Sequence, residues 1–99
     1  MKMIKKYVDA IDDELHGAET YAEKYIECKV NDNNAAAEKY HEMAHDELKH
    51  AMYEHEFAKE AIDKLSKFYT APPEMLKRWE ESHLEYIEKT AGIKKLLEM

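Results

Sequence analysis

Asn31-Asp32-Asn33-Asn34 separates two long stretches of helical character and sets the fold we expect for this 99-residue chain. Asn and Asp favour turns, and both are good residues for the start of a helix. A second break, Thr70-Ala71-Pro72-Pro73, follows the second stretch, and Pro is well tolerated in a first helical turn. The two breaks predict three helices, over roughly residues 2–30, 34–69 and 73–97.

The composition indicates a single all-α domain covering residues 1–99. Only two Gly and two Pro are present and 37% of the residues are charged, which is typical of long helices joined by short loops. The formal net charge of −7 disfavours nucleic acid or an anionic membrane as a partner. Cys28 is the only cysteine, so an intramolecular disulfide is excluded. Because we recognise no signal peptide and no membrane-spanning stretch, we expect a cytoplasmic protein.

Apolar residues recur at alternating steps of three and four along each predicted helix and define the expected core. The seam of the first helix contains Ile4, Tyr7, Ile11, Glu14, Ala18, Tyr21 and Tyr25. That of the second contains Ala37, Tyr40, Ala44, Glu47, Ala51, Glu54, Ala58, Ala61, Leu65 and Phe68. That of the third contains Leu76, Trp79, His83, Tyr86, Thr90, Ile93 and Leu97. Glu14 and Glu47 stand out, because a carboxylate on a buried seam needs a partner charge, and a metal ion is one.

Glu47 and His50 form a Glu-x-x-His pair in the second helix. Residues three apart lie on one helix face, so this carboxylate and this imidazole can hold one metal ion together. If the first two helices form an antiparallel hairpin centred near residue 32, Glu14 lies about 5 Å from the level of Glu47 along the axis. We therefore expect Glu14, Glu47 and His50 to converge. Glu54, one heptad after Glu47, is either an accessory ligand or an exposed residue.

A second Glu-x-x-His pair, Glu80 and His83, occurs in the third helix. A hairpin centred near residue 71 places Glu80 opposite residue 62, which is on the order of 20 Å from Glu47 along the axis. We do not expect this pair to join the first site within one chain. His83 is more simply explained as a histidine at a helix interface.

One Glu and one Glu-x-x-His are half of the ligand set of a di-iron carboxylate site. A full site takes a Glu from each of two helices and a Glu-x-x-His from each of two others. Two copies of the hairpin related by a two-fold axis would supply that set in a four-helix bundle. The sequence thus predicts a homo-oligomer with a site at the subunit interface. Its oxygen-rich ligands would suit iron or manganese.

Two segments resemble the metal-binding helices of the ferritin-like superfamily, as found in bacterioferritins and rubrerythrins. Residues 13–21, Asp-Glu-Leu-His-Gly-Ala-Glu-Thr-Tyr, resemble the first of those helices, in which a ligand Glu precedes a Tyr by seven residues. Residues 40–51, Tyr-His-Glu-Met-Ala-His-Asp-Glu-Leu-Lys-His-Ala, are similar to the second. The resemblance implies that Glu14 is a terminal ligand, that Glu47 bridges two metals and that His50 binds through a ring nitrogen. It also implies that Tyr21 hydrogen-bonds a ligand carboxylate.

The resemblance implies a ferroxidase that oxidises Fe(II) to Fe(III) in iron storage or detoxification. Bacterioferritins and rubrerythrins carry both halves of the site in one chain, whereas this chain carries one half. It is closer in plan to the encapsulated ferritins, short two-helix proteins that complete a ferroxidase site by dimerising. Whether a shell or encapsulin partner exists stays open, because residues 91–97 resemble a helix end more than an encapsulin-loading peptide. The oxidant, dioxygen or peroxide, stays open.

Two other functions remain open at this point. The chain could be a non-catalytic helical assembly or interaction protein, in which Glu14 and Glu47 are exposed or pair with Lys24 or Lys49. It could also be a zinc peptidase, because His41-Glu42-Met43-Ala44-His45 matches the His-Glu-x-x-His pattern. The peptidase alternative has poor support, since the chain lacks a strand to bind a peptide substrate.

Overall fold

The fold is all-α. The structure, a computed structural model, describes residues 2–99 and has three helices: α1 (Lys2–Val30), α2 (Asn34–Phe68) and α3 (Pro73–Leu97). No strand occurs at positions 2 to 99. The three predicted helices are confirmed, and α2 ends one residue earlier than expected.

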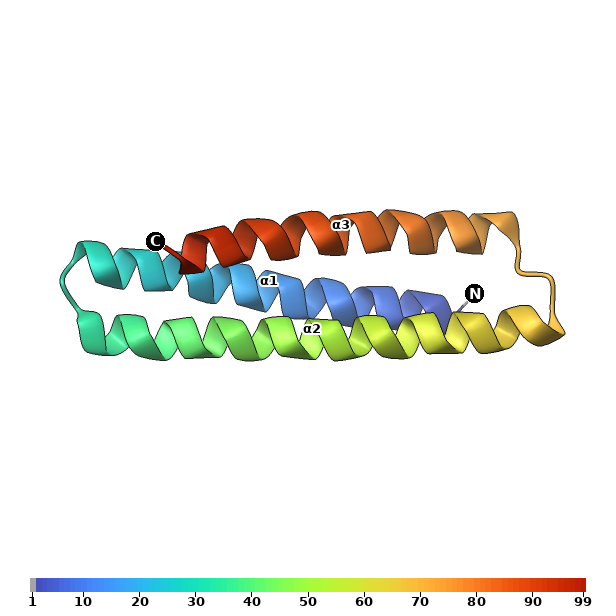
Figure 1. The fold of residues 1–99 in the computed structure, drawn as a ribbon, viewed down its shortest axis with the longest axis horizontal. Helices are drawn as coiled ribbons and strands as arrows, with labels where there is room; N and C mark the ends of the chain where they lie inside the picture. Colours follow the sequence, from blue (N-terminus) through green and yellow to red (C-terminus); the bar gives the residue numbers. More distant parts are fainter. Residues whose placement is uncertain (1) are drawn as a thin grey trace.

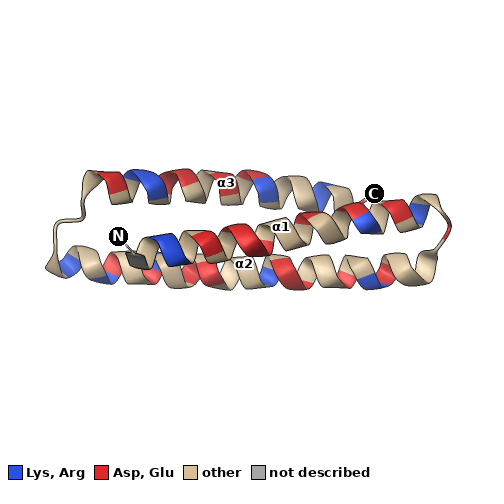
Figure 2. Cartoon of the chain, turned by 180° about the vertical axis from the view of Figure 1, so that it is seen from behind, with Lys and Arg blue, Asp and Glu red and all other residues tan. Residues whose placement is uncertain are grey.

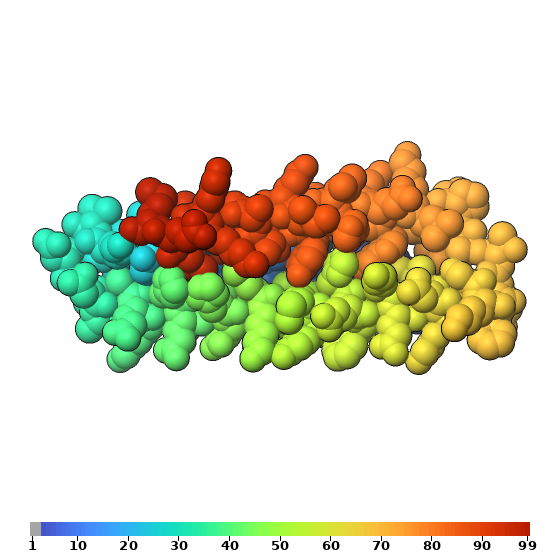
Figure 3. Space-filling model, viewed as in Figure 1, coloured from blue at the N-terminus to red at the C-terminus, as the bar shows by residue number. Residues whose placement is uncertain are grey.

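The helices lie side by side in a rod of 55 × 18 × 16 Å (Figure 1). α1 and α2 form an antiparallel hairpin, and α3 folds back antiparallel to α2. α3 packs mainly on α1 and touches α2 at few places. From one side, the side chains of α2 and α3 cover most of α1 (Figure 3). α1 is therefore the central helix, because it packs against both α2 and α3.

The first loop has the local chemistry that its sequence predicts. The side chain of Asn33 caps α2 by accepting a hydrogen bond from the backbone nitrogen of Ala36, at 3.3 Å. Asp32 has a φ of 58°, a left-handed conformation that Asp adopts more readily than most residues. α3 begins at Pro73, and Pro72 is its N-cap. The two prolines thus mark the end of the loop after α2 and the start of α3.

The core includes predicted seam residues such as Ile11, Ala44 and Ile93 but is rotated relative to the predicted seams. The buried residues of α1 are Ile4, Val8, Ile11, Leu15, Ala18 and Ala22. Those of α2 are Ala37, Ala44, Leu48, Ala51, Ala58 and Ile62, and those of α3 are Met75, Ser82, Ile93 and Leu97. The prediction that Glu14 and Glu47 lie on a buried seam is therefore wrong, because both are half-buried at its edge. The reason is that α1 buries its surface against two helices, which turns the centre of its apolar face towards α3.

The main polar contact between α2 and α3 is a pair of histidines. Nε2 of His55 and Nδ1 of His83 are 2.8 Å apart, so one ring donates a hydrogen bond and the other accepts it. The ring of His55 stacks on Tyr86 and also contacts Trp79, at centroid separations of 4.4 and 5.0 Å. Burial lowers the pKa of His55, and the nearby His83 and Lys59 lower it further, while Glu56 acts in the opposite direction. His83 is thus a residue of a helix interface, as the sequence suggested.

Replacing His83 by Ala should loosen the docking of α3 on α2. The change removes the hydrogen bond and leaves His55 unpaired among aromatic rings, which should cost about 1 to 2 kcal/mol of unfolding free energy. Urea unfolding followed by the fluorescence of Trp79, which contacts this pair, measures the effect. His16→Ala, at an exposed position of α1, is the control. A transition midpoint equal to that of the control would show that the histidine pair contributes nothing.

Both acidic and basic residues occur along all three helices (Figure 2). Within the described part of the chain, none of the helices combines the length and the apolar character that crossing a membrane requires.

Candidate metal centre

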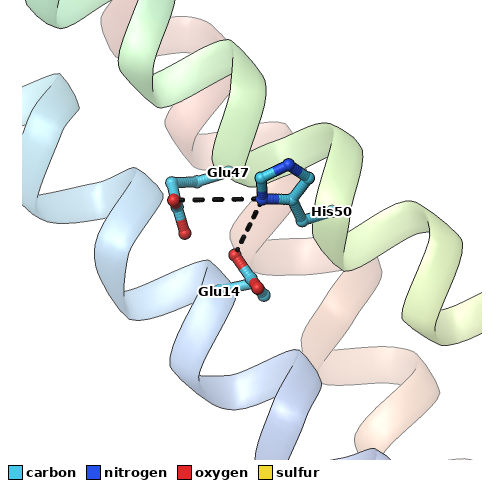
Figure 4. Close-up of side chains that lie close together, drawn as sticks. All are labelled: Glu14, Glu47 and His50. Atoms are coloured by element: carbon cyan, nitrogen blue, oxygen red, sulfur yellow. Dashed lines mark ion pairs between the residues drawn. The ribbon is translucent and has the colours of Figure 1, made fainter.

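Glu14, Glu47 and His50 meet on one face of the α1–α2 hairpin (Figure 4). Nδ1 of His50 lies 3.4 Å from Oε2 of Glu14 and 4.0 Å from Oε1 of Glu47. One ligand atom from each of the three residues falls within 4.8 Å of the other two. The convergence predicted from the helix spacing and the hairpin register is confirmed.

The site lies on the side of the hairpin that α3 does not cover. In Figure 4, α3 passes behind α1 and α2, and the three side chains lie in front of them. The relative exposures of these side chains are 28% for Glu14, 26% for Glu47 and 54% for His50. The cluster is thus sheltered by its own helices but open on one face.

The geometry fits a divalent cation. Carboxylate oxygens and imidazole nitrogens bind such ions at about 2.0–2.2 Å, so two ligands of one ion lie about 3 to 4.4 Å apart. The separations of His50 from the two carboxylates fall in that range. Two carboxylates and one imidazole form an oxygen-rich set, of the kind that iron and manganese accept.

The two carboxyl groups are held close together against their mutual repulsion. A hydrogen bond with Glu14 raises the pKa of Glu47 to about 7, and burial and the negative charge of Glu14 act in the same direction. His50 opposes this shift only in part. Among the side chains of residues 3–99, His50 is the only ion-pair partner of Glu14 and Glu47, and no lysine pairs with either. The site therefore has an excess of negative charge that a bound cation would balance.

The contribution of Glu47 to the stability of the metal-free protein should fall as the pH rises. The pKa of Glu47 is 4.5 in an ordinary environment and about 7 in the folded chain, so the folded state binds the proton more tightly. The resulting stabilisation is complete below about pH 4.5 and is lost as the pH rises through about 7. Glu47→Gln keeps a hydrogen-bond donor for Glu14 at every pH and should lack this dependence.

Thermal unfolding of the two proteins in the presence of a chelator measures this difference. At about pH 4 we expect nearly equal Tm values, because the carboxyl group of Glu47 is then neutral in the folded chain and mostly neutral in the unfolded chain. At about pH 8 the Gln variant should melt roughly 3 °C higher, a modest gain because solvent screens these partly exposed groups. The same Tm difference at both pH values would contradict the raised pKa of Glu47.

Two further predicted residues lie outside the cluster. Tyr21 stacks on Tyr40 with ring centroids 6.2 Å apart, and no hydrogen bond links its hydroxyl to a carboxylate at positions 2–99. Glu54 is half-buried but is not among the residues whose ligand atoms converge. Lys24, an expected ion-pair partner under the assembly alternative, lies over the ring of Tyr40 instead.

The rival histidine motif has another role. Nε2 of His41 lies 3.0 Å from the carbonyl oxygen of Leu97 and donates a hydrogen bond to it. The ring of His41 also packs against Tyr25 and His45. This nitrogen ties the last turn of α3 to α2, so the structure offers no support for a zinc peptidase site. Glu80 is exposed, and neither Glu80 nor His83 joins the cluster, as predicted.

Sequence reasoning missed Gly17 in α1. A methyl group added at this glycine would lie 3.0 Å from Oε2 of Glu47, so Gly17 forms part of the wall of the site. The available signal was a glycine in the interior of a helix, one turn after Glu14, in a chain with only two glycines.

The chain was compared with protein-family models, with curated proteins and with solved structures, and none of the three comparisons gave a match. The assignment of a function therefore depends on the geometry of the site.

Proposed function

We propose that the protein is a ferritin-like di-iron protein that oxidises Fe(II) to Fe(III). The observation that carries this proposal is the meeting of Glu14, Glu47 and His50 from two helices within 4.8 Å. Among the side chains of residues 3–99, only His50 forms an ion pair with either carboxylate. A pair of carboxylates held together in this way destabilises the metal-free protein, which is a cost typical of binding sites.

The proposed site is completed by a second copy of the chain. One chain supplies three ligands, and a di-iron carboxylate site needs about twice that number. A two-fold axis beside the open face of the hairpin would bring two such sets together. The side chains of Met43 and Phe57 support this arrangement, because they flank His50 at heptad spacing on α2 and are 39% and 52% exposed. In a dimer these apolar groups would be buried around the metal ligands.

The chemistry assigned to the site is electron transfer from iron to an oxidant. In the reaction with dioxygen, two Fe(II) ions give up one electron each, and dioxygen takes the two electrons and two protons to become hydrogen peroxide. The carboxylates of Glu14 and Glu47 would hold both ions close together and favour the more highly charged Fe(III) product. His50 would supply the nitrogen ligand.

Aerobic addition of Fe(II) to the metal-free protein tests the proposal. We expect the absorbance of Fe(III) to rise at least about tenfold faster than in protein-free buffer, because general positioning of two reactants alone gives a larger effect. A rate equal to that of buffer would refute the ferroxidase activity. Parallel additions of Mn(II) and Zn(II) before iron show which other ions compete for the site.

A further inference from the structure

The absence of a side chain at Gly17 makes room for a neighbouring side chain and is not required by a turn of the backbone. It lies in the interior of α1, where glycine destabilises a helix by roughly 1 kcal/mol relative to alanine. Its φ angle is not positive, so the backbone at this position is open to any residue. The backbone conformation therefore does not require a glycine at position 17, whereas the atoms around this position restrict the size of its side chain.

The neighbours of Gly17 are atoms of one side chain. The three atoms that an added methyl group would approach most closely are Oε2, Cδ and Cγ of Glu47, at 3.0, 3.4 and 3.6 Å. The first of these distances is shorter than ordinary van der Waals contact. The carboxylate of Glu47 thus lies directly over the bare backbone of α1.

The contact between Gly17 and Glu47 affects how closely the carboxyl group of Glu47 approaches Glu14. Gly17 and Glu14 are three apart in α1 and so lie on one face, a turn from each other. Glu47, which reaches across from α2, has its carboxyl group close to both, with a ligand oxygen within 4.8 Å of one of Glu14 and the close approach to Gly17. A larger residue at position 17 would push this carboxyl group away by a few tenths of an ångström, because the end of a Glu side chain yields more easily than a helix backbone.

We infer that Gly17 is a positioning residue, which keeps the Glu47 carboxylate close to α1 so that it meets Glu14 and His50. The other glycine, Gly92, shows the contrast, because a methyl group added there would have no atom within 4 Å. Gly92 is exposed in α3. The chain thus offers a matched control for the same substitution.

A thermal comparison in metal-free protein tests the inference without relying on any metal. Gly92→Ala should raise Tm by a few degrees through helix propensity alone. Gly17→Ala should give a comparable rise only in a Glu47→Ala background, where no carboxylate opposes the new methyl group. In the wild-type background the rise should be smaller by at least about 2 °C or should turn into a fall. Equal shifts in the two backgrounds would overturn the inference.

Metal affinity provides a second test of the inference about Gly17, and this test rests on the proposed function. We expect Gly17→Ala to weaken Co(II) binding about tenfold in anaerobic titration, as loss of a group that orients a ligand does, and Gly92→Ala to leave it unchanged. Unchanged affinity in Gly17→Ala, while the wild-type protein binds, would refute the positioning role. Absence of Co(II) and Fe(II) binding in the wild-type protein would refute the proposed function instead, and the thermal comparison would still decide the role of Gly17.

Discussion

A Glu47→Ala/His50→Ala variant is expected to lose the oxidation of Fe(II) by at least about 100-fold. Removal of a group that only orients a metal ligand costs up to that factor, and these two residues are two of the three groups whose ligand atoms converge. The helix should survive the change, because both side chains lie at the edge of the core rather than in it. The initial rate of Fe(III) formation after aerobic addition of Fe(II) is the measurement.

The control is Glu60→Ala/His16→Ala, which removes the same two residue types at exposed positions outside the cluster. Its oxidation rate should equal that of the wild-type protein. Circular dichroism of both variants establishes that the helices are retained. If the cluster variant oxidised iron as fast as this control, Glu47 and His50 would not be the site of the reaction.

The second large effect is expected at the centre of the core. Ile11 is fully buried and belongs to the cluster that joins α1 to both of its neighbours, with Leu48 from α2 and Ile93 from α3. Ile11→Ala should lower the unfolding free energy by about 3 kcal/mol, from lost burial and from the cavity left behind. In a domain of this size the change corresponds to a fall in Tm of about 12 °C or more.

The control for this prediction is Ile87→Ala in α3, where the side chain is 49% exposed. Its effect should stay below about 1 kcal/mol, because less surface is removed from contact with other residues. Denaturant unfolding monitored by circular dichroism compares the two variants. A similar loss of stability in both would contradict the placement of Ile11 at the centre of the molecule.

The helices could be predicted because their ends have strong local signals. Asn33 supplies the cap of α2, and Pro73 occupies the first turn of α3, both of which depend only on the neighbouring sequence. The convergence of Glu14, Glu47 and His50 was also predictable. It follows from the three-residue spacing on a helix and from the axial register that a short loop imposes on a hairpin.

The rotation of the core could not be predicted from the periodicity of the apolar residues. Leu15 and Leu48 are buried, while the neighbouring Glu14 and Glu47 lie at the edge of the core, and either choice fits a heptad pattern. What decides between them is the position of α3, which depends on long-range packing. The contact of His55 with His83 belongs to the same class, because it joins residues 28 apart in sequence. Gly17 was missed for a related reason, since its role appears only when Glu47 lies above it.

Native mass spectrometry of the protein during anaerobic titration with Fe(II) tests whether two chains share one di-iron site, because it reports assembly and stoichiometry together. We predict a dimer, or a multiple of it, that holds about two iron ions per pair of chains. The Glu47→Ala/His50→Ala variant should remain free of iron under the same conditions. Fewer than about one iron ion per pair of chains in the wild-type protein at saturating Fe(II) would contradict the di-iron site.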